Sequence, residues 1–570
     1  MTTLSATPTA AATPADAAVP TPRARHAATL IVLRDAPRGL EVLLLRRTDR
    51  PGDQNSGAAV FPGGLIAAAD GAHHGLCTGF DDVGASARLG LPDGGLGFWI
   101  GAIRECFEEA GLLFAVDEQG AAVDLASVPA DELFALRQRL HDDEIGMADV
   151  CARLGVRLDP SRLAYHSHWI TPQGMPKIFD TRFFIAEAPA GQSALHDGGE
   201  TVEMLWLTPA EALENARKLK LLRATSVTLK HISAYATAAE AVAAARAQET
   251  VPTTRPRLAA GPAGRTAVER WEAPYAEVGR LDPSGRGDVS TQLLPGRPVW
   301  LSPRVLRVTA PNGSQMTGPG TNSYFVGSAG GEWVLLDPGP DDAAHLQALR
   351  DAAPGPVTRI LVTHTHKDHS PAARVLAAEW GARTLGQTAR HPQWQDEGFV
   401  PDETLDGGER LALGEGTTLR VLHTPGHASN HLCYLLEEEK LLFTGDHLMQ
   451  GSSVVINPPD GDMTAYFRSL EQLLEVDLDW LAPGHGFLID EPHAEVRKAI
   501  GHRLAREAKV LAAVNSHGPA DAEQLLAVVY ADTPPRLHAA ALRSLLAHLI
   551  KLHRDQVVTA DAQGRWGRAA

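Results

Sequence analysis

The hydrophobic and polar positions change their period several times along the chain, and each change marks a predicted element. Residues 27–235 alternate short apolar runs, which predict strands such as Glu41–Leu45, with segments that have helical period. A further apolar run, Ile360–Val362, predicts a buried strand, and similar runs precede residues 427, 446 and 485. The chain is therefore predicted to be an α/β protein.

The pattern differs between and after these two stretches. Residues 234–247 are rich in Ala and predict a helix, and Pro, Gly, Thr and Arg follow, so residues 236–296 are predicted to be a helix and a linker. Near the C-terminus the pattern predicts three helices and a small β wing, at residues 502–517, 520–530, 537–553 and from 557 to about Trp566.

The length of the chain requires more than one domain. A single hydrophobic core rarely serves 570 residues, so we expect several compact parts. The first residues are mostly Ala, Thr and Pro and predict a disordered tail, although Arg23 and Arg25 leave an organellar transit peptide open. The predicted divisions are 1–26, 27–235, 236–296, 297–495 and 496–570.

The amino-acid composition of the chain limits which partners and which cellular compartment we expect. Hydrophobic residues make up 44% and charged residues 21%, which is typical of soluble globular proteins, and no apolar run is long enough to span a bilayer. The net charge of −17 disfavours a polyanionic partner, although a local basic groove stays open. Four cysteines without paired spacing indicate a reducing, cytoplasmic environment. We expect small-molecule substrates and no membrane contact; RNA is possible but not favoured, and a homo-oligomer is possible.

The richest group of potential metal ligands is His364-Thr365-His366-Lys367-Asp368-His369, directly after the predicted strand. Imidazole nitrogens and carboxylate oxygens suit Zn²⁺ and similar ions. A lone His-x-His is usually an accident of surface or core. Here three further turns after apolar runs carry His427, Asp446 and His485, and together they predict a metal site.

These segments, within residues 300–495, resemble the metallo-β-lactamase superfamily of hydrolases. The resemblance implies a site for two Zn²⁺ ions, whose shared water loses its proton near neutral pH. Its implied ligands are His364, His366 and His427 for one ion, Asp368, His369 and His485 for the second, and Asp446 bridging both. Asp368 is also a candidate catalytic residue. It further implies that Asp337 supports a ligand, and we expect His423, His431 and His447 to support or pack.

A second chemical feature is the predicted helix Arg104-Glu105-Cys106-Phe107-Glu108-Glu109-Ala110-Gly111. Three- and four-residue steps place Glu105, Glu108 and Glu109 on one face, where they repel one another unless a cation neutralises them. The alternative is a solvated acidic face. Gly111 can end the helix, and carboxylates of this kind suit Mg²⁺ or Mn²⁺ bridging a diphosphate.

With Val60-Phe61-Pro62-Gly63-Gly64 upstream, this helix resembles the box of Nudix hydrolases. The resemblance implies that Glu108 and Glu109 bind Mg²⁺ or Mn²⁺, that Glu105 is a further ligand or base, and that Arg104 orients the glutamates. These three glutamates are the other candidate catalytic residues. Two departures stand out: Asp70 replaces the expected glutamate, and residues 73–98 separate the two halves of the box.

Other segments suggest subgroups. Residues 168–172, 179–184 and Glu203 before 205–209 are similar to the Nudix subgroup that contains peroxisomal coenzyme A diphosphatases. Residues 316–324 and 454–463 resemble the lactamase-β-2-like branch, which carries a winged-helix-like C-terminal cap. The implied architecture is a Nudix α/β/α sandwich, a metallo-β-lactamase αβ/βα sandwich and a small winged-helix-like domain.

Three hypotheses about function follow. The leading one is a bifunctional hydrolase, with a Nudix diphosphatase acting on a nucleoside-diphosphate-linked substrate of coenzyme A type and a dinuclear zinc site acting on a thioester or phosphodiester. The alternative is an RNA-processing enzyme that combines 5′-end hydrolysis with endonucleolytic cleavage. In the third, one domain is a non-catalytic ligand sensor. All seven candidate ligands of the zinc site and all three Nudix glutamates are present, which favours the two enzymatic hypotheses over the ligand sensor.

Overall fold

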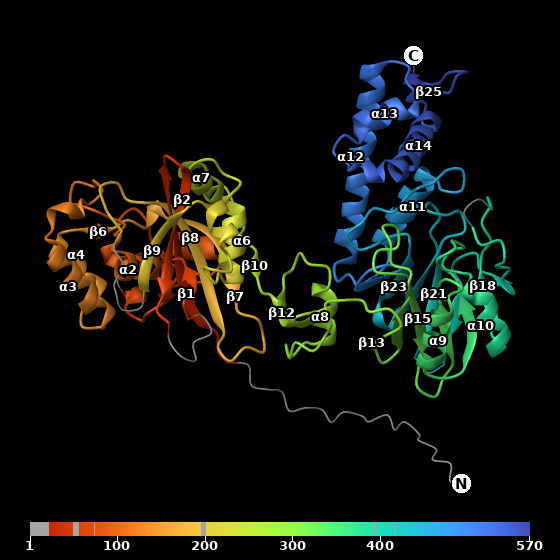
Figure 1. Ribbon diagram of the computed structural model, residues 1–570, viewed down its shortest axis with the longest axis horizontal. Helices are drawn as coiled ribbons and strands as arrows, with labels where there is room; N and C mark the ends of the chain where they lie inside the picture. Colours follow the sequence, from red (N-terminus) through yellow and green to blue (C-terminus); the bar gives the residue numbers. More distant parts are fainter. Residues whose placement is uncertain are drawn as a thin grey trace, which may run out of the picture. The chain divides into compact units, whose positions relative to one another are not determined.

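The computed structural model describes residues 22–49, 56–72, 74–194, 201–392, 395–414 and 416–569. The chain divides into two compact units (Figure 1): unit 1 comprises residues 1–257 with 284–286, and unit 2 comprises residues 258–283 with 287–570. Residues 1–21 of the predicted tail lie outside the described residues, and the first strand begins at Arg25.

Unit 1 is built on a mixed, eight-stranded sheet, with β10-β7-β8-β1-β2-β3 as its main order; β4 pairs with β1, and β9 pairs with β2. The central strand β1 pairs in parallel with β8 and antiparallel with β2. The strands of the sheet are β1 (Arg25–Ala36), β2 (Gly39–Arg47), β3 (Ala59–Val60), β4 (Gly63–Leu65), β7 (Ala164–Ile170), β8 (Phe179–Glu187), β9 (Thr201–Leu207) and β10 (Thr253–Thr254).

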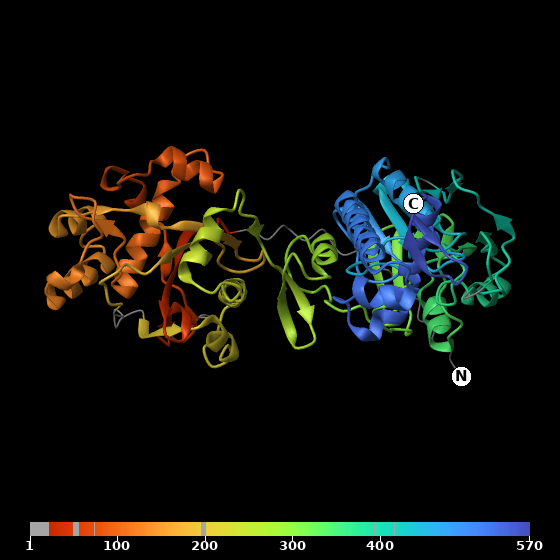
Figure 2. The ribbon, with the colours of Figure 1, turned by 90° about the horizontal axis from the view of Figure 1, so that it is seen from above.

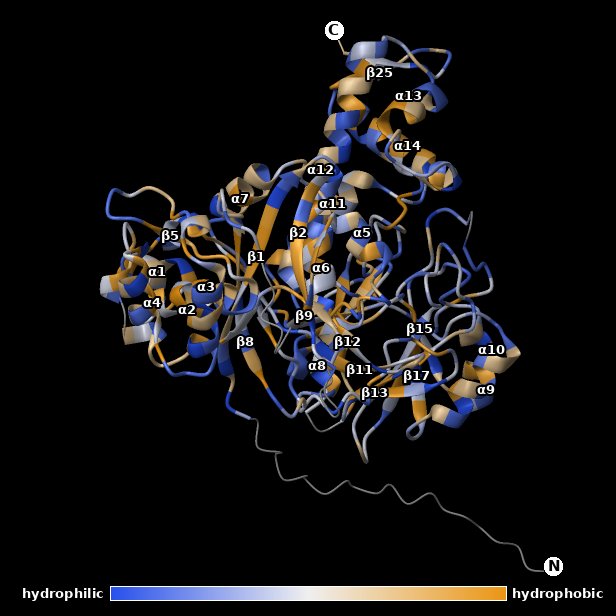
Figure 3. Ribbon diagram, turned by 60° about the vertical axis from the view of Figure 1, so that its left-hand side comes forward, coloured by the Kyte–Doolittle hydropathy of each residue, from blue (hydrophilic) through white to orange (hydrophobic). Residues whose placement is uncertain are grey.

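Helices cover both faces of this sheet. One face packs against α2, whose buried residues include Trp99 and Phe107, and the other packs against α6 and α7. Figure 3 shows hydrophobic residues concentrated on inner elements such as β8 and α2. The predicted α/β/α sandwich is therefore confirmed. Its helices are α1 (Asp82–Leu89), α2 (Leu96–Ala110), α3 (Ala130–His141), α4 (Met147–Leu154), α5 (Pro209–Glu214), α6 (Arg223–Ile232) and α7 (Ala238–Arg246), and a two-stranded sheet pairs β5 (Ala115–Val116) with β6 (Arg157–Leu158).

The residues that interrupt the Nudix-like box are folded. Within residues 74–98 the chain forms α1, which Asp81 caps by accepting a hydrogen bond from Gly84 N. The carboxylate of Asp82 accepts from the backbone nitrogens of Gly94 and Leu96, and this fixes the start of α2. Residue 73 lies outside the described residues. The interruption thus lengthens and anchors the glutamate helix.

Unit 2 contains two sheets packed face to face around a shared core. The first has seven strands in sequence order, with α9 and α10 on its outer face; the second has five, with α11 on its outer face. This is the predicted αβ/βα sandwich. Its elements are β13 (Pro298–Ser302), β14 (Val305–Thr309), β15 (Asn322–Gly327), β16 (Trp333–Leu336), α9 (Ala343–Ala352), β17 (Val357–Leu361), α10 (Ala372–Trp380), β18 (Arg383–Gly386), β19 (Glu403–Thr404), β20 (Arg410–Ala412), β21 (Thr418–His423), β22 (Leu432–Leu436), β23 (Leu441–Gly445), α11 (Met463–Leu474) and β24 (Trp480–Pro483).

The stretch predicted to be a linker differs from that expectation. After α7 it forms the hairpin β11 (Arg257–Gly261) and β12 (Gly264–Val268) and then α8 (Tyr275–Leu281), with a small core of its own. Its Glu277 is buried and forms a two-bonded ion pair with Arg307 of β14, at 2.7 and 2.8 Å. Glu277 also accepts a hydrogen bond from Leu488 N. The hydrophobic periodicity of the sequence does not reveal these contacts, because they join residues far apart in the chain.

We expect Glu277→Ala to lower the free energy of unfolding of unit 2 by about 3–5 kcal/mol, because the substitution leaves the guanidinium of Arg307 buried without its partner. The matched control is Glu379→Ala, which removes an exposed ion pair with Arg350 and should cost less than about 1 kcal/mol. Chemical denaturation of the full chain measures both. Equal effects of the two substitutions would contradict the structural role of Glu277.

The C-terminal residues form three helices and a two-stranded wing, as predicted (Figure 2, blue). These elements are α12 (Pro492–His517), α13 (Ala522–Val529), α14 (His538–Arg554), β25 (Val558–Ala560) and β26 (Trp566–Arg568). They share a core around Leu525, Leu545 and Leu549. Throughout the described part of the chain, no helix combines the length and apolar character needed to cross a bilayer. All four cysteines are buried and unpaired.

Candidate active sites

The histidines and aspartates predicted as ligands in unit 2 lie in turns that follow strand ends. β17 leads into residues 364–369, β21 into His427, β23 into Asp446 and β24 into His485. Both sheets deliver these turns to one edge of the sandwich, so residues more than 100 positions apart meet there. The structure brings all seven predicted residues together.

Their ligand atoms form two clusters that share one carboxylate. In each cluster the ligand atoms lie within 4.8 Å of one another, and Asp446 belongs to both. The clusters are His364, His366, His427 and Asp446, and Asp368, His369, Asp446 and His485. The grouping matches the two ligand sets that the sequence resemblance implied.

Hydrogen bonds on the far side of the rings turn one nitrogen of each of four histidines toward the site. The Nδ1 atoms of His427 and His485 donate to the carbonyl oxygens of Val455 and Gly320, at 2.7 and 3.1 Å. The Nδ1 of His369 donates to Asp337 Oδ2, at 3.0 Å. Because the Thr363 hydroxyl donates to Asp337, it accepts from His364 Nδ1. The Nε2 atoms are therefore left for a ligand.

The atoms that face the site fit a cation. Nε2 of His369, Nε2 of His485 and Oδ1 of Asp446 are buried without a hydrogen-bond partner among the described residues. The Nε2 atoms of His369 and His485 each lie 3.3–3.4 Å from Asp368 Oδ2 and from Asp446 Oδ1. Ligands at about 2.0–2.1 Å around a tetrahedral ion lie about 3.3–3.4 Å apart. In the other cluster, His366 Nδ1 lies 2.9 Å from His364 Nε2 and 3.0 Å from His427 Nε2. One proton on His366 Nδ1 cannot serve both of these acceptor nitrogens well, whereas a cation can bind all three.

The protonation of the two clusters differs. Burial, together with the neighbouring imidazoles, holds the pKa of His364 well below its usual value and lowers the pKa of His366 to about 4. Burial opposes charge on His485 too, but the Asp446 and Asp368 carboxylates outweigh it and raise its pKa to about 9. A histidine that binds a metal must be neutral, so a divalent cation at the second cluster would displace the proton that these carboxylates otherwise stabilise on His485.

The supporting residues agree with the predictions made for them. Asp337 accepts hydrogen bonds from Thr363 N and Thr363 Oγ1, at 2.7 and 2.8 Å, as well as from His369. His431 stacks on His364, with ring centroids 5.1 Å apart, and His447 packs on Tyr466. His423 lies 3.4 Å from Ser429 O through its Nε2. None of these four belongs to the two clusters.

We expect Asp337→Ala to weaken divalent-metal binding about 10- to 100-fold, because His369 loses the partner that orients its ring. Competition with a chromophoric chelator measures the affinity. Asp351→Ala, on the exposed side of α9, serves as the control and should bind metal like the wild type. Unchanged affinity in Asp337→Ala would contradict the supporting role.

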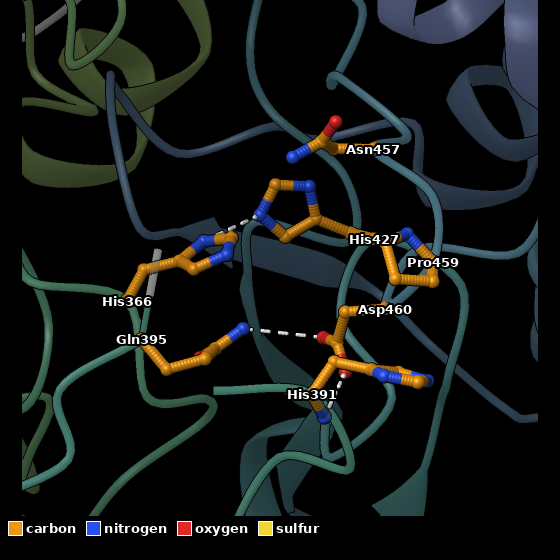
Figure 4. Close-up of a pocket in the computed structure, with 7 residues that line it drawn as sticks. All are labelled: His366, His391, Gln395, His427, Asn457, Pro459 and Asp460. Atoms are coloured by element: carbon orange, nitrogen blue, oxygen red, sulfur yellow. Dashed lines mark hydrogen bonds between the residues drawn. The ribbon is translucent and has the colours of Figure 1, made fainter. Parts of the chain in front are cut away.

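A cleft opens at the first cluster, and sequence reasoning assigned no role to several residues that line it. Figure 4 shows His366 and His427 together with His391, Gln395, Asn457, Pro459 and Asp460. Asp460 organises this wall by accepting hydrogen bonds from Gln395 Nε2, Ser429 N and Ser429 Oγ. Asn457 and Asp460 lie in the quoted segment 454–463, but their spacing alone does not reveal that they reach the cleft.

In unit 1 the three predicted glutamates lie along one face of α2, next to the glycine turn. Glu109 accepts a hydrogen bond from Gly63 N, at 2.9 Å. A β-carbon on Gly64 would stand 2.6 Å from the carboxyl atoms of Glu105, so a larger residue here would displace that side chain. Gly111, with a φ of +71°, ends the helix as predicted. The contact between the turn and the helix positions both parts of the box.

Arg104 holds two of the glutamates. Its Nη1 lies 3.0 Å from Glu105 Oε1 and donates to Glu108 Oε1 at 3.1 Å. Asp70 in turn holds Arg104 through bonds of 2.9 and 3.1 Å to Nε and Nη2. Asp70, which replaces the glutamate of the Nudix pattern, is therefore the buried partner of Arg104. Sequence reasoning noted this aspartate but not its role.

The environment of these glutamates disfavours their negative charge. Burial, only partly offset by Arg104, raises the pKa of Glu105 to about 7 and also raises the pKa of Glu108. A bound cation would reverse this by stabilising the carboxylates. Among the described residues, the ligand atoms of Glu105, Glu108 and Glu109 do not form a cluster as close as those in unit 2. Their assignment as metal ligands stays a prediction.

The two candidate sites, the metal-ligand clusters of unit 2 and the carboxylate helix of unit 1, lie in two domains that family models identify as hydrolase domains. Models of three families match the chain: the metallo-beta-lactamase superfamily at residues 316–485, the NUDT19 Nudix domain at residues 74–225, and the beta-lactamase associated winged helix domain at residues 522–566. Both hydrolase families bind divalent metals. The chain belongs to the metallo-β-lactamase superfamily and also carries a Nudix domain.

Relatives of known sequence support this membership. The chain is 30% identical over 262 residues to a beta-lactamase-like protein 2 homolog of Caenorhabditis elegans, covering 45% of this chain and 87% of the relative. The Drosophila melanogaster homolog is also 30% identical, over 45% of this chain and 89% of its own length. An atrochrysone carboxyl ACP thioesterase of Aspergillus chevalieri is 31% identical, over 47% of this chain and 87% of its own.

Proposed function

We propose that unit 2 hydrolyses thioesters at a dinuclear zinc site and that unit 1 hydrolyses the diphosphate of a coenzyme A-type molecule. The observation that supports the first activity best is the convergence of seven ligand residues into two clusters sharing Asp446. Bound divalent ions supply Lewis-acid charge and lower the pKa of water near neutrality. His364, His366 and His427 would hold one ion, Asp368, His369 and His485 the other, and Asp446 both.

The residues of the chain provide orientation and an electrostatic frame. The backbone carbonyls of Val455 and Gly320 and the carboxylate of Asp337 fix ring tautomers, so the ligand nitrogens need no reorganisation. In thioester hydrolysis the water oxygen bonds to the carbonyl carbon, the carbon–sulfur bond breaks, and the thiol leaves with a proton. The thioesterase name of the Aspergillus relative supports this choice over a phosphodiester.

Unit 1 would cleave a diphosphate. Glu108 and Glu109 would hold Mg²⁺ or Mn²⁺, Glu105 would be a further ligand or take the proton of the attacking water, and Arg104 would keep Glu105 and Glu108 in place. Water attacks one phosphorus atom and the bridging oxygen leaves with the other. With coenzyme A the products are 4′-phosphopantetheine and adenosine 3′,5′-bisphosphate. The similarity of residues 168–172 and 179–184 to coenzyme A diphosphatases supports this substrate.

An acyl-coenzyme A tests both parts at once. The chain of residues 1–570 with Zn²⁺ and Mg²⁺ should release free thiol, detected with a thiol reagent, and 4′-phosphopantetheine or its acyl form, detected by mass spectrometry. The appearance of neither product would overturn the proposal. Cleavage of single-stranded RNA in the same preparation, lost in His366→Ala, would instead favour RNA processing.

A further inference from the structure

A second cavity lies next to the cleft of the metal-ligand centre in unit 2. It has a volume of about 260 Å³, and His391 and Pro459 line both this cavity and the cleft. One wall comes from the segment that follows Ile456 and from the start of α11, and the other comes from α14. A molecule held at the cleft can therefore continue into the cavity and touch the C-terminal helices.

The lining of the cavity combines apolar and charged side chains. Pro458, Met463, Ala547 and Ile550 supply apolar surface. Lys551 and Arg554, one turn apart on α14, supply two positive charges. A cavity lined by apolar side chains and by two cations, with the carboxylate of Asp462 beside Arg554, suits a flexible chain that carries an anion.

Both cations are held in position by carboxylates, yet each keeps donors for a ligand. Lys551 Nζ donates to Glu507 Oε1 and Asp555 Oδ2, both at 2.8 Å, which leaves one of its three protons. Arg554 pairs through Nη1 with Asp462, the residue that caps α11. Among the described residues, its other guanidinium nitrogens make no hydrogen bond, and its side chain is 58% exposed. A phosphate would complete this arrangement with charge-assisted bonds.

We propose that this cavity binds the phosphopantetheine arm of a thioester substrate, with Lys551 and Arg554 contacting its phosphate. The inference rests on the proposed thioester hydrolysis, which places the acyl–sulfur bond at the metal-ligand centre. A phosphopantetheine arm has this chemistry: a thioester at one end, a mostly uncharged chain, and a phosphate at the other. Coenzyme A and an acyl carrier protein both present it.

The lining favours this occupant over a nucleic acid. Single strands are held by stacking on aromatic side chains together with a cationic groove that follows the backbone. Of the described residues that line the cavity, only His391 carries an aromatic ring. The two cations lie one turn apart on α14 and line the same cavity, which suits one phosphate group.

Three acetyl thioesters test the proposal with full-length protein: S-acetyl-pantetheine, S-acetyl-4′-phosphopantetheine and acetyl-coenzyme A, with an acetylated carrier protein as a fourth arm. Thiol release gives kcat/KM for each. The wild type should prefer the phosphorylated compounds about 10- to 100-fold, as expected for charged hydrogen bonds to one group. Lys551→Gln and Arg554→Gln should each remove about tenfold or more of that preference and leave hydrolysis of S-acetyl-pantetheine unchanged.

Two controls separate phosphate binding from damage to the helices. Asp462→Asn also breaks the ion pair with Arg554, but asparagine still caps α11 and the cation stays, so the preference should persist or rise. Lys509→Gln removes an exposed charge of α12 that pairs with Asp532, away from the cavity, and should change nothing.

The outcomes discriminate between the two proposals. Loss of preference in the Lys551 and Arg554 variants, for acetyl-coenzyme A or for the carrier protein, supports the site and tells which source it serves. Equal hydrolysis of S-acetyl-pantetheine and its phosphorylated form by the wild type overturns the site and leaves the thioesterase standing. A preference that the two variants do not change also overturns it. Hydrolysis of none of the thioesters overturns the proposed function itself.

Discussion

Asp446→Asn is expected to abolish thioester hydrolysis and to lower the content of bound zinc. Asp446 is the one residue shared by the two ligand clusters, and its carboxylate lies 3.3–3.4 Å from the Nε2 atoms of His369 and His485. Asparagine keeps the volume but removes the charge that the two sets share. The loss of activity should exceed the about 10- to 100-fold that follows loss of a supporting residue.

Zinc per chain, measured by atomic emission after dialysis, and thiol release measure the two effects. Asp477→Asn is the matched control, because Asp477 is 76% exposed and pairs with the Lys440 side chain at the surface of the same unit. It should keep full zinc and full activity. Wild-type zinc content and activity in Asp446→Asn would show that Asp446 is not a shared ligand.

Glu108→Gln is expected to lower diphosphate hydrolysis by more than about 100-fold while leaving the thioesterase unchanged. The side chain is buried, and glutamine can still accept the hydrogen bond from Arg104 Nη1. The substitution therefore removes charge at the predicted cation site with little change in packing.

Release of 4′-phosphopantetheine from coenzyme A measures the loss. Glu144→Gln provides the matched control, since Glu144 is 61% exposed and pairs with Arg139 away from α2. Diphosphatase activity that survives in Glu108→Gln would mean that the helix is not the catalytic element of unit 1.

The sequence alone predicted which residues of unit 2 would converge, because these candidate ligands stand in short turns after apolar runs. His364–His369, His427, Asp446 and His485 each follow a strand, and strand ends meet at a common edge of the sandwich. The same logic predicted that the three glutamates of α2 share one face, since helical spacing places them there. Both predictions used only local pattern and the resemblance of that pattern to known families.

Contacts between residues far apart in the sequence could not be predicted, because a local pattern carries no information about them. No local period shows that Glu277 meets Arg307, that Asp70 holds Arg104, or that Asp460 fastens Gln395. Residues 257–281 looked like a linker because Pro and Gly are frequent there, yet they form a hairpin and a helix. The cavity beside the cleft takes Asp462 and Arg554 from elements 92 positions apart, which only the fold brings together.

We propose that two separate sites in this chain act on different bonds of one class of substrate. The most direct measurement follows the release of thiol and of adenosine 3′,5′-bisphosphate from acetyl-coenzyme A by wild type, Glu108→Gln and His366→Ala in parallel. We expect Glu108→Gln to release thiol at the wild-type rate without cleaving the diphosphate, and His366→Ala to do the reverse. If either variant lost both activities, or if both variants kept both activities, the assignment of one activity to each unit would be wrong.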